Sequence, residues 1–437
     1  MPSLATASTA LPWWRSRDWW PIAASQLAGV SIGLISVRLA TQFVPADIYG
    51  AYGLAQAGAA LGGSVAFAGL VRHAAVHGAG SRTRGAYLAW CLRHATLPAV
   101  VSLALLAIYW LTVGRDGGLI VAPAIVGAVA VATLIGGLTL VPHQVLQRSR
   151  AYARDCGLTV TNSSLRSFLP LLVAAASGAT LTALVGGLAA AGVLSVCIGF
   201  GWALPKTDPR PTGTSAGDAP TSVRSYHLSF LAGGGLAWIA AYLNRGIGAH
   251  LWSGDELGWF VLAGNLAVVL PNVWSAICWQ FVFPRAGEAF RHGDHRAGER
   301  WLQRGLVLFV AGALVLGAML PHVLPALAGT LIDAAYTPAL AFVPPQYAYG
   351  CALAALHFAS GRLLLRDRPA RSFAVTATGV VTLGTLCIGA AALDTSTYLR
   401  ALVWSPWIAG GVAWLTSLAL TPRSTATPPS SPTLSVS

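Results

Sequence analysis

The chain has 437 residues, of which 55% are hydrophobic and only 9% are charged. A soluble domain carries roughly 25% charged residues, so this composition excludes a soluble globular protein. The net charge of +13 is spread over short arginine clusters between apolar stretches and no nucleic-acid-binding module accompanies it, so nucleic acid is not an expected partner.

Long apolar stretches recur along almost the whole chain. A helix needs about 20 consecutive apolar residues to cross the hydrocarbon layer of a membrane. We therefore predict an all-α, polytopic membrane protein with about twelve transmembrane helices. In chain order, the predicted spans are residues 20–43, 48–71, 94–112, 118–141, 157–177, 181–203, 228–250, 257–282, 305–327, 341–361, 373–393 and 401–420.

The positive charges alternate with these spans. If the N-terminus is cytoplasmic, the cytoplasmic connections hold 22 of the 27 lysine and arginine residues, and the opposite side holds only Arg115 and Arg400. Connections rich in lysine and arginine stay in the cytoplasm during membrane insertion. The charge distribution therefore predicts that both termini are cytoplasmic.

Two stretches rich in Pro, Ser and Thr interrupt the apolar pattern. Such compositions are typical of disordered segments, and we predict a cytoplasmic linker at 206–225 and a disordered cytoplasmic tail at 422–437. They divide the chain into an N-terminal six-helix half at 1–205 and a C-terminal six-helix half at 226–421.

A short motif occurs at the same place in both halves. Asp47-Ile-Tyr-Gly50 follows the first predicted span, and Asp255-Glu-Leu-Gly258 follows the seventh. Because both halves begin on the same side, we predict parallel repeats about an axis along the membrane normal, an organisation common in secondary transporters. The two aspartates are expected at helix N-termini, where a carboxylate stabilises the helix dipole.

Three arginines lie inside predicted spans: Arg38, Arg166 and Arg245. An arginine in mid-span costs about 3 kcal/mol on insertion scales, so it normally faces a polar cavity or a charged partner. All 14 acidic residues lie in loops or at span ends, so we expect an anionic ligand such as phosphate, which guanidinium groups bind bidentately. The repeat predicts that Arg38 and Arg245 face each other across a central cavity, although both could instead extend to the lipid headgroups.

Two asparagines accompany these arginines. Asn162 lies four residues before Arg166 on the same face of a polar helix, which predicts either a cavity lining or hydrogen bonds between helices. Asn244 directly precedes Arg245. The six cysteines fall singly, without a histidine at ligand spacing, so neither a metal site nor another cofactor is expected.

The arginine-containing segments resemble those of a known transporter family. The resemblance rests on Val37-Arg38-Leu39 with Pro45 to Tyr52, on Gln144 to Arg148, and on Asn244-Arg245 with Gly254 to Phe260. Together with twelve spans in two halves, these segments resemble the Wzx-type O-antigen and exopolysaccharide flippases of the multidrug/oligosaccharidyl-lipid/polysaccharide (MOP) exporter superfamily.

This resemblance implies a bacterial inner-membrane transporter that moves undecaprenyl-pyrophosphate-linked oligosaccharide from the cytoplasmic to the periplasmic leaflet for surface polysaccharide synthesis. The lipid-linked oligosaccharide and membrane lipids are the implied partners, with other polysaccharide assembly proteins as further candidates. The family usually has an acidic residue where this chain has Asn244. That difference removes an obvious site for a coupling cation or proton.

The substrate would bind in a cationic cavity that opens to either side in turn. Arg38, Arg166, Arg245, Asn162 and Asn244 are the expected binding residues, and no enzyme activity is expected. One alternative is a membrane polymerase, ligase or glycosyltransferase acting on lipid-linked sugars, although such enzymes usually have a large outer loop. The other is a multidrug exporter of the same superfamily, although exporters of organic cations need carboxylates within the membrane.

Overall fold

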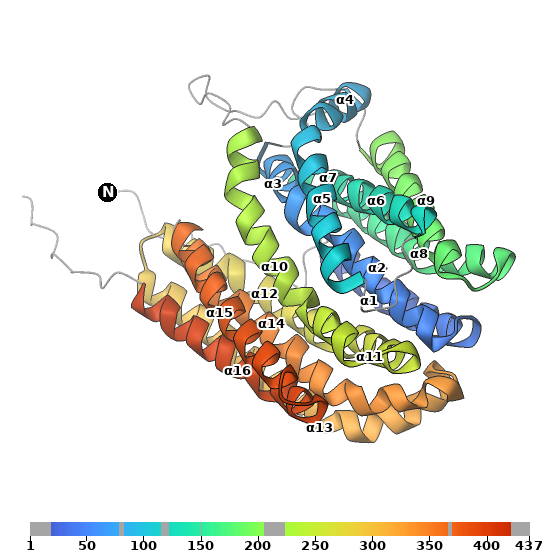
Figure 1. Cartoon of the computed structure of the whole chain (residues 1–437). Helices are drawn as coiled ribbons and strands as arrows, with labels where there is room; N and C mark the ends of the chain where they lie inside the picture. The colour runs from blue at the N-terminus through green and yellow to red at the C-terminus, as the bar shows by residue number, and fades with distance from the viewer. Residues whose placement is uncertain are drawn as a thin grey trace, which may run out of the picture.

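A computed structural model describes residues 19–77, 83–114, 122–149, 151–204, 223–365 and 369–420. Within these ranges all regular structure is helical (Figure 1). The predicted tail at 422–437 and all but the last three residues of the predicted linker at 206–225 lie outside them. We refer to residues 19–204 as the N-terminal half and to residues 223–420 as the C-terminal half.

The described residues of the N-terminal half form nine α-helices and three π-helical turns. They are α1 (Trp19–Phe43), α2 (Ala46–Leu61), η2 (Gly62–Ala66), α3 (Ala68–His77), α4 (Arg84–His94), α5 (Thr96–Tyr109), η3 (Trp110–Gly114), α6 (Pro123–Leu138), α7 (Leu140–Arg148), α8 (Tyr152–Ser177), α9 (Leu181–Ile198) and η4 (Gly199–Ala203).

In the C-terminal half, the part of the chain that the structure describes forms seven α-helices and one 3₁₀ segment. They are α10 (Val223–Leu251), α11 (Gly254–Ala267), α12 (Val269–Arg291), α13 (His295–Leu331), η5 (Ala334–Phe342), α14 (Val343–Leu364), α15 (Pro369–Ala391) and α16 (Thr395–Ala419).

The prediction of a polytopic all-α membrane protein is confirmed. In the described ranges, nine helical segments are long and apolar enough to cross a membrane, and α2 with α3, bent by 53°, makes a tenth. The remaining two predicted spans correspond to α8 and α10. Polar residues in these two helices, Asn162 and Arg166 in α8 and Asn244 and Arg245 in α10, lower their hydropathy.

Large apolar side chains cover much of the outer surface. Leu111 is 78% exposed, Val307 is 68% exposed and Leu415 is 65% exposed. In water such surfaces would favour aggregation, whereas lipid chains are as apolar as these side chains. The exposed apolar surface is therefore the one expected of helices that face lipid.

The two halves meet where α2 crosses α11. In Figure 1 the blue-to-green helices of the N-terminal half gather on one side of α10, and the orange-to-red helices gather on the other. A Cβ atom on Gly50 would lie 2.8 Å from the backbone nitrogen of Gly258, and one on Gly258 would overlap the carbonyl oxygen of Ala46. The glycines of the two similar motifs therefore allow the helices to touch. Asp47 and Asp255 lie in the first turns of α2 and α11, as expected.

A second contact between the halves joins the end of α1 to the segment after α13. Tyr336 Oη donates to the carbonyl oxygen of Val44 at 2.7 Å, and the backbone nitrogen of Asp333 donates to Thr41 Oγ1 at 3.2 Å. The rings of Tyr49 and Tyr336 meet edge to face at 6.0 Å. These contacts and the α2–α11 crossing hold the two halves together at one end of the molecule. We call this region of the interface the closed seam.

Candidate functional site

A cavity of about 460 Å³ lies between the two halves. Its walls come from α2, η2, α6, α7, α8 and α9 of the N-terminal half and from α10 and α11 of the C-terminal half. The polar and charged residues that line it are Gln56, Ser64, Arg166, Tyr242, Arg245 and Asn265. Two guanidinium groups and no described carboxylate line this space, which we call the cationic cavity.

Arg166 reaches the cationic cavity from α8. Its Nη2 donates to Thr139 Oγ1 at 2.8 Å, at the break between α6 and α7. The side chain is exposed, and it forms no ion pair with a described residue. Pro170 lies one turn further along α8 and lacks the N–H that would bond the carbonyl of Arg166. Since an arginine has five N–H donors, Arg166 retains donors for a ligand.

Arg245 reaches the same cavity from α10. Its Nη1 donates to the carbonyl oxygen of Gly53 at 3.2 Å, and its Nη2 donates to Asn265 Oδ1 at 2.6 Å. The Cζ atom also lies 5.3 Å from the centre of the Tyr242 ring. All three partners are neutral, so they orient the guanidinium without cancelling its charge.

Asn265 connects the cationic cavity to a smaller neighbouring one. Its Nδ2 donates to Tyr49 Oη at 3.0 Å, which extends the network from Arg245 to the closed seam. The smaller cavity has a volume of about 210 Å³, and both Gln56 and Asn265 line it as well. Sequence reasoning missed these two residues, although each is a carboxamide within a predicted span. A polar side chain within an apolar span is the feature of the sequence that could have indicated them.

Arg38 lies elsewhere. Its Nη1 donates to the carbonyl oxygen of Ile332, at the end of α13, at 3.0 Å. Arg38 lines neither of the two cavities. The expectation that Arg38 and Arg245 face each other across a central cavity is therefore wrong in this conformation, because Arg38 bonds the main chain at the closed seam. Arg166, from α8, is the second arginine that lines the cationic cavity with Arg245.

Asn162 and Arg166 share one face of α8, as predicted, and that face contacts α7 and the break before it. Asn162 is 8% exposed, and its Nδ2 contacts His143 Nε2 at 2.9 Å. His143 Nδ1 in turn lies 2.7 Å from Asp155 Oδ1. Asn162 therefore belongs to a hydrogen-bonded group beside the cationic cavity, and does not line it.

Asn244 points away from the cationic cavity. Its side chain is 5% exposed, and its Nδ2 donates to Gln346 Oε1 at 2.6 Å, within the C-terminal half. Its Oδ1 accepts from the backbone nitrogen of Arg245 at 2.9 Å. Successive residues of a helix point about 100° apart, so Arg245 can face the cavity while Asn244 packs within the C-terminal half.

The arrangement is suited to binding an anion rather than to covalent chemistry. Two guanidinium groups, each hydrogen-bonded to neutral acceptors, line the cavity together with two carboxamides that can donate or accept hydrogen bonds. Among the described residues, no three His, Cys, Asp or Glu side chains come together in a way that could hold a metal ion.

No protein-family model and no curated protein matches the sequence. Among solved structures, the lipid II flippase MurJ in an inward closed conformation matches with a TM-score of 0.60 and 11% identity, over 92% of this chain and 87% of that chain. An inward-facing multidrug resistance MATE family transporter of the MOP superfamily matches with a TM-score of 0.53 and 15% identity, over 92% of this chain and 93% of that chain. An outward-facing MATE transporter matches with a TM-score of 0.56 and 15% identity, over 93% of this chain and 96% of that chain. The chain thus has the fold of these membrane transporters.

Proposed function

We propose that this protein flips undecaprenyl-pyrophosphate-linked oligosaccharide from the cytoplasmic to the periplasmic leaflet of the bacterial inner membrane, for O-antigen or exopolysaccharide synthesis. The observation that carries the proposal is the cationic cavity, which Arg166 and Arg245 both line without a described carboxylate. The shared fold with transporters, among them a lipid II flippase, supports it.

Electrostatics favours a pyrophosphate in this cavity. Two positive charges that line one cavity without a described carboxylate repel each other, so an anion that binds between them is stabilised. A pyrophosphate carries enough negative charge for both guanidinium groups and offers oxygens to each in a bidentate arrangement. An organic cation would meet repulsion instead, which argues against the multidrug exporter.

We assign different roles to the candidate residues. Arg166 and Arg245 contact the pyrophosphate, and Asn265 fixes the direction of Arg245. Arg38 acts at the closed seam through Ile332. Asn162 and Asn244 act indirectly, since their side chains bond His143 and Gln346.

Translocation would proceed by alternating access, with the closed seam opening as the other end of the interface closes. The charge distribution of the sequence predicts that the closed seam is periplasmic and that both termini are cytoplasmic. The described conformation would then be one that receives the lipid-linked sugar from the cytoplasmic leaflet. Membrane lipids surround the protein, and other polysaccharide assembly proteins are proposed to receive the product.

Transport in purified vesicles tests the proposal. The protein would be reconstituted with a fluorescent undecaprenyl-pyrophosphate-linked oligosaccharide, and the sugar exposed on each leaflet would be measured by an impermeant quencher. We expect transfer between leaflets that empty vesicles lack. Transfer of an organic cation in place of the lipid would favour the exporter, and conversion of the lipid-linked sugar to a new product would favour an enzyme.

A further inference from the structure

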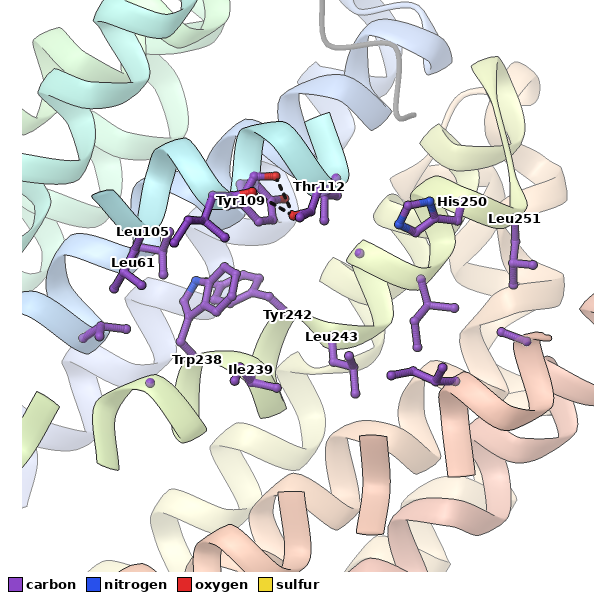
Figure 2. A pocket seen from close by; sticks show the side chains of 18 of the residues that line it. Leu61, Leu105, Tyr109, Thr112, Trp238, Ile239, Tyr242, Leu243, His250 and Leu251 are labelled. Atoms are coloured by element: carbon purple, nitrogen blue, oxygen red, sulfur yellow. Dashed lines mark hydrogen bonds between the residues drawn. The ribbon is translucent and has the colours of Figure 1, made fainter. Parts of the chain in front are cut away.

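An apolar groove of about 900 Å³ lies beside the cationic cavity (Figure 2). It runs between α5 and η3 of the N-terminal half and α10 and α15 of the C-terminal half. Figure 2 shows Leu61, Leu105 and Trp238 towards one end, and His250 and Leu251 towards the other. Nearly all of its lining is aliphatic or aromatic.

Several polar groups of the lining are already bonded to main-chain carbonyls. Tyr109 Oη donates to Leu54 at 3.0 Å, and Trp238 Nε1 donates to Ala57 at 2.9 Å. Thr112 Oγ1 donates to Ile108 at 2.9 Å. These side chains therefore present carbon to the groove, which suits a hydrocarbon and offers little to a polar ligand.

Tyr242 connects the groove to the cationic cavity, because it lines both. Its ring stacks near the guanidinium of Arg245, with 5.3 Å between Cζ and the ring centre. A ligand with an anionic head beside Arg245 can thus extend past Tyr242 into an apolar channel. A lipid with a pyrophosphate head and a hydrocarbon chain has its anionic and apolar parts in this order.

We propose that this groove binds the isoprenoid chain of the lipid-linked substrate while the pyrophosphate occupies the cationic cavity. The inference rests on the proposed function. The surrounding lipid is as apolar as the groove, so the chain gains no hydrophobic transfer energy by entering it. The groove therefore acts through shape, by holding the chain in one alignment with the head group. A substrate whose chain is too short to enter the groove should therefore be unaffected by changes in it.

Two glycines of α10 provide a matched pair of variants. Gly235 lines the groove, and a Cβ atom there would meet no heavy atom within 4 Å. Gly233 lies two residues earlier on the same helix and has the same open space around its Cβ, but it does not line the groove. Gly235→Phe therefore fills the groove, and Gly233→Phe makes the same chemical change outside it.

The experiment measures transport in vesicles by wild type and both variants. Each would be given the full-length lipid-linked sugar and an analogue with the same head group and a short chain. We expect Gly235→Phe to transport the full-length lipid at least about tenfold more slowly than wild type, because a filled site must distort to admit the chain. The short analogue should be transported at a similar rate by all three proteins.

Other outcomes overturn the assignment. Equal transport of the full-length lipid by Gly235→Phe and wild type would show that the chain does not use the groove. Equal loss of both substrates would show that Gly235 matters only for the structure. Failure of wild type to transport either substrate would reject the proposed function itself, and the groove assignment with it.

Photochemical labelling separates the isoprenoid chain from ordinary phospholipid. A lipid-linked sugar with a photoreactive group in its chain should label α10, and Gly235→Phe should reduce that labelling where Gly233→Phe does not. If a photoreactive phospholipid labels the groove as strongly, and an excess of lipid-linked sugar does not displace it, the groove is a general lipid site and the assignment is wrong.

Discussion

Arg38 and Arg245 make equivalent hydrogen bonds in opposite directions across the interface. Arg38, in the N-terminal half, donates from Nη1 to the carbonyl of Ile332 in the C-terminal half at 3.0 Å. Arg245, in the C-terminal half, donates from Nη1 to the carbonyl of Gly53 in the N-terminal half at 3.2 Å. The two residues therefore both tie the halves together, but only Arg245 also reaches the cationic cavity.

This difference predicts different tolerance to lysine. Arg38→Lys keeps a charged donor for one carbonyl and should retain most of the wild-type transport. Arg245→Lys replaces the guanidinium group, whose two terminal nitrogens donate to Gly53 and to Asn265 at the same time, with an ammonium group that lacks this geometry. Its transport should therefore fall well below that of Arg38→Lys. Both would be measured by complementation of surface polysaccharide, normalised to protein in the membrane. If Arg38→Lys were as inactive as Arg38→Ala, the result would indicate that the guanidinium group of Arg38 itself binds the substrate.

The α2–α11 crossing predicts that Gly258→Ala weakens the closed seam. The added methyl group would overlap the carbonyl oxygen of Ala46, and such overpacking costs about 1–3 kcal/mol. Val44 is 3% exposed at the seam, so a cysteine replacing it reports seam opening by its rate of reaction with an impermeant thiol reagent. Labelling should be faster with Gly258→Ala than without it.

Gly33→Ala is the control, because a Cβ at Gly33 would meet no heavy atom within 4 Å. That variant should label at the wild-type rate. Identical labelling with Gly258→Ala and Gly33→Ala would mean that the glycine crossing does not hold the seam.

Asn265 offers a test of the charge in the cationic cavity. Asn265→Asp places a carboxylate at the atom that accepts from Arg245 Nη2, so it would neutralise part of the positive charge. Transport should fall more for Asn265→Asp than for Asn265→Ala, which leaves Arg245 charged but less well oriented. The same vesicle assay measures both. A more active aspartate variant would contradict an anionic substrate.

The aspartates of the two similar motifs are predicted to be structural. Asp47 and Asp255 lie in the first turns of α2 and α11, where a carboxylate typically contributes about 0.3–1 kcal/mol through the helix dipole. Asp47→Asn and Asp255→Asn should therefore lower thermal stability slightly and leave transport near the wild-type rate. Loss of activity in either variant at normal abundance would reopen the enzyme alternative.

Much of the fold could be predicted from the sequence, because membrane spans depend on local composition. The bend between α2 and α3 and the polar spans α8 and α10 fell within predicted spans. The residues brought together at the interface could not be predicted in the same way. The bond from Arg38 to Ile332 joins residues 294 positions apart, and nothing in the local pattern of either segment indicates the other.

The candidate site was therefore predicted only in part. Arg166 and Arg245 could be predicted as site residues because a charged side chain inside a membrane span is energetically costly and usually has a functional role. Asn265 was not predicted, because an uncharged amide within a span is a weaker signal than a charge, although it orients Arg245. Asn244 and Asn162 were chosen for their closeness in sequence to the arginines, and the structure gives them other neighbours.

The central claim is that Arg166 and Arg245 bind the pyrophosphate of the substrate, and one measurement tests it most directly. Transport of lipid-linked oligosaccharide into the opposite leaflet of vesicles would be compared for wild type, Arg166→Ala, Arg245→Ala and the control Arg93→Ala, an exposed arginine at the end of α4. If the bound pyrophosphate buries its charge pairs with both arginines, truncating one partner of such a pair costs about 2–5 kcal/mol, so each cavity variant should lose at least about thirtyfold in transport while Arg93→Ala loses none. Wild-type transport by both Arg166→Ala and Arg245→Ala, at equal amounts of reconstituted protein, would contradict the account.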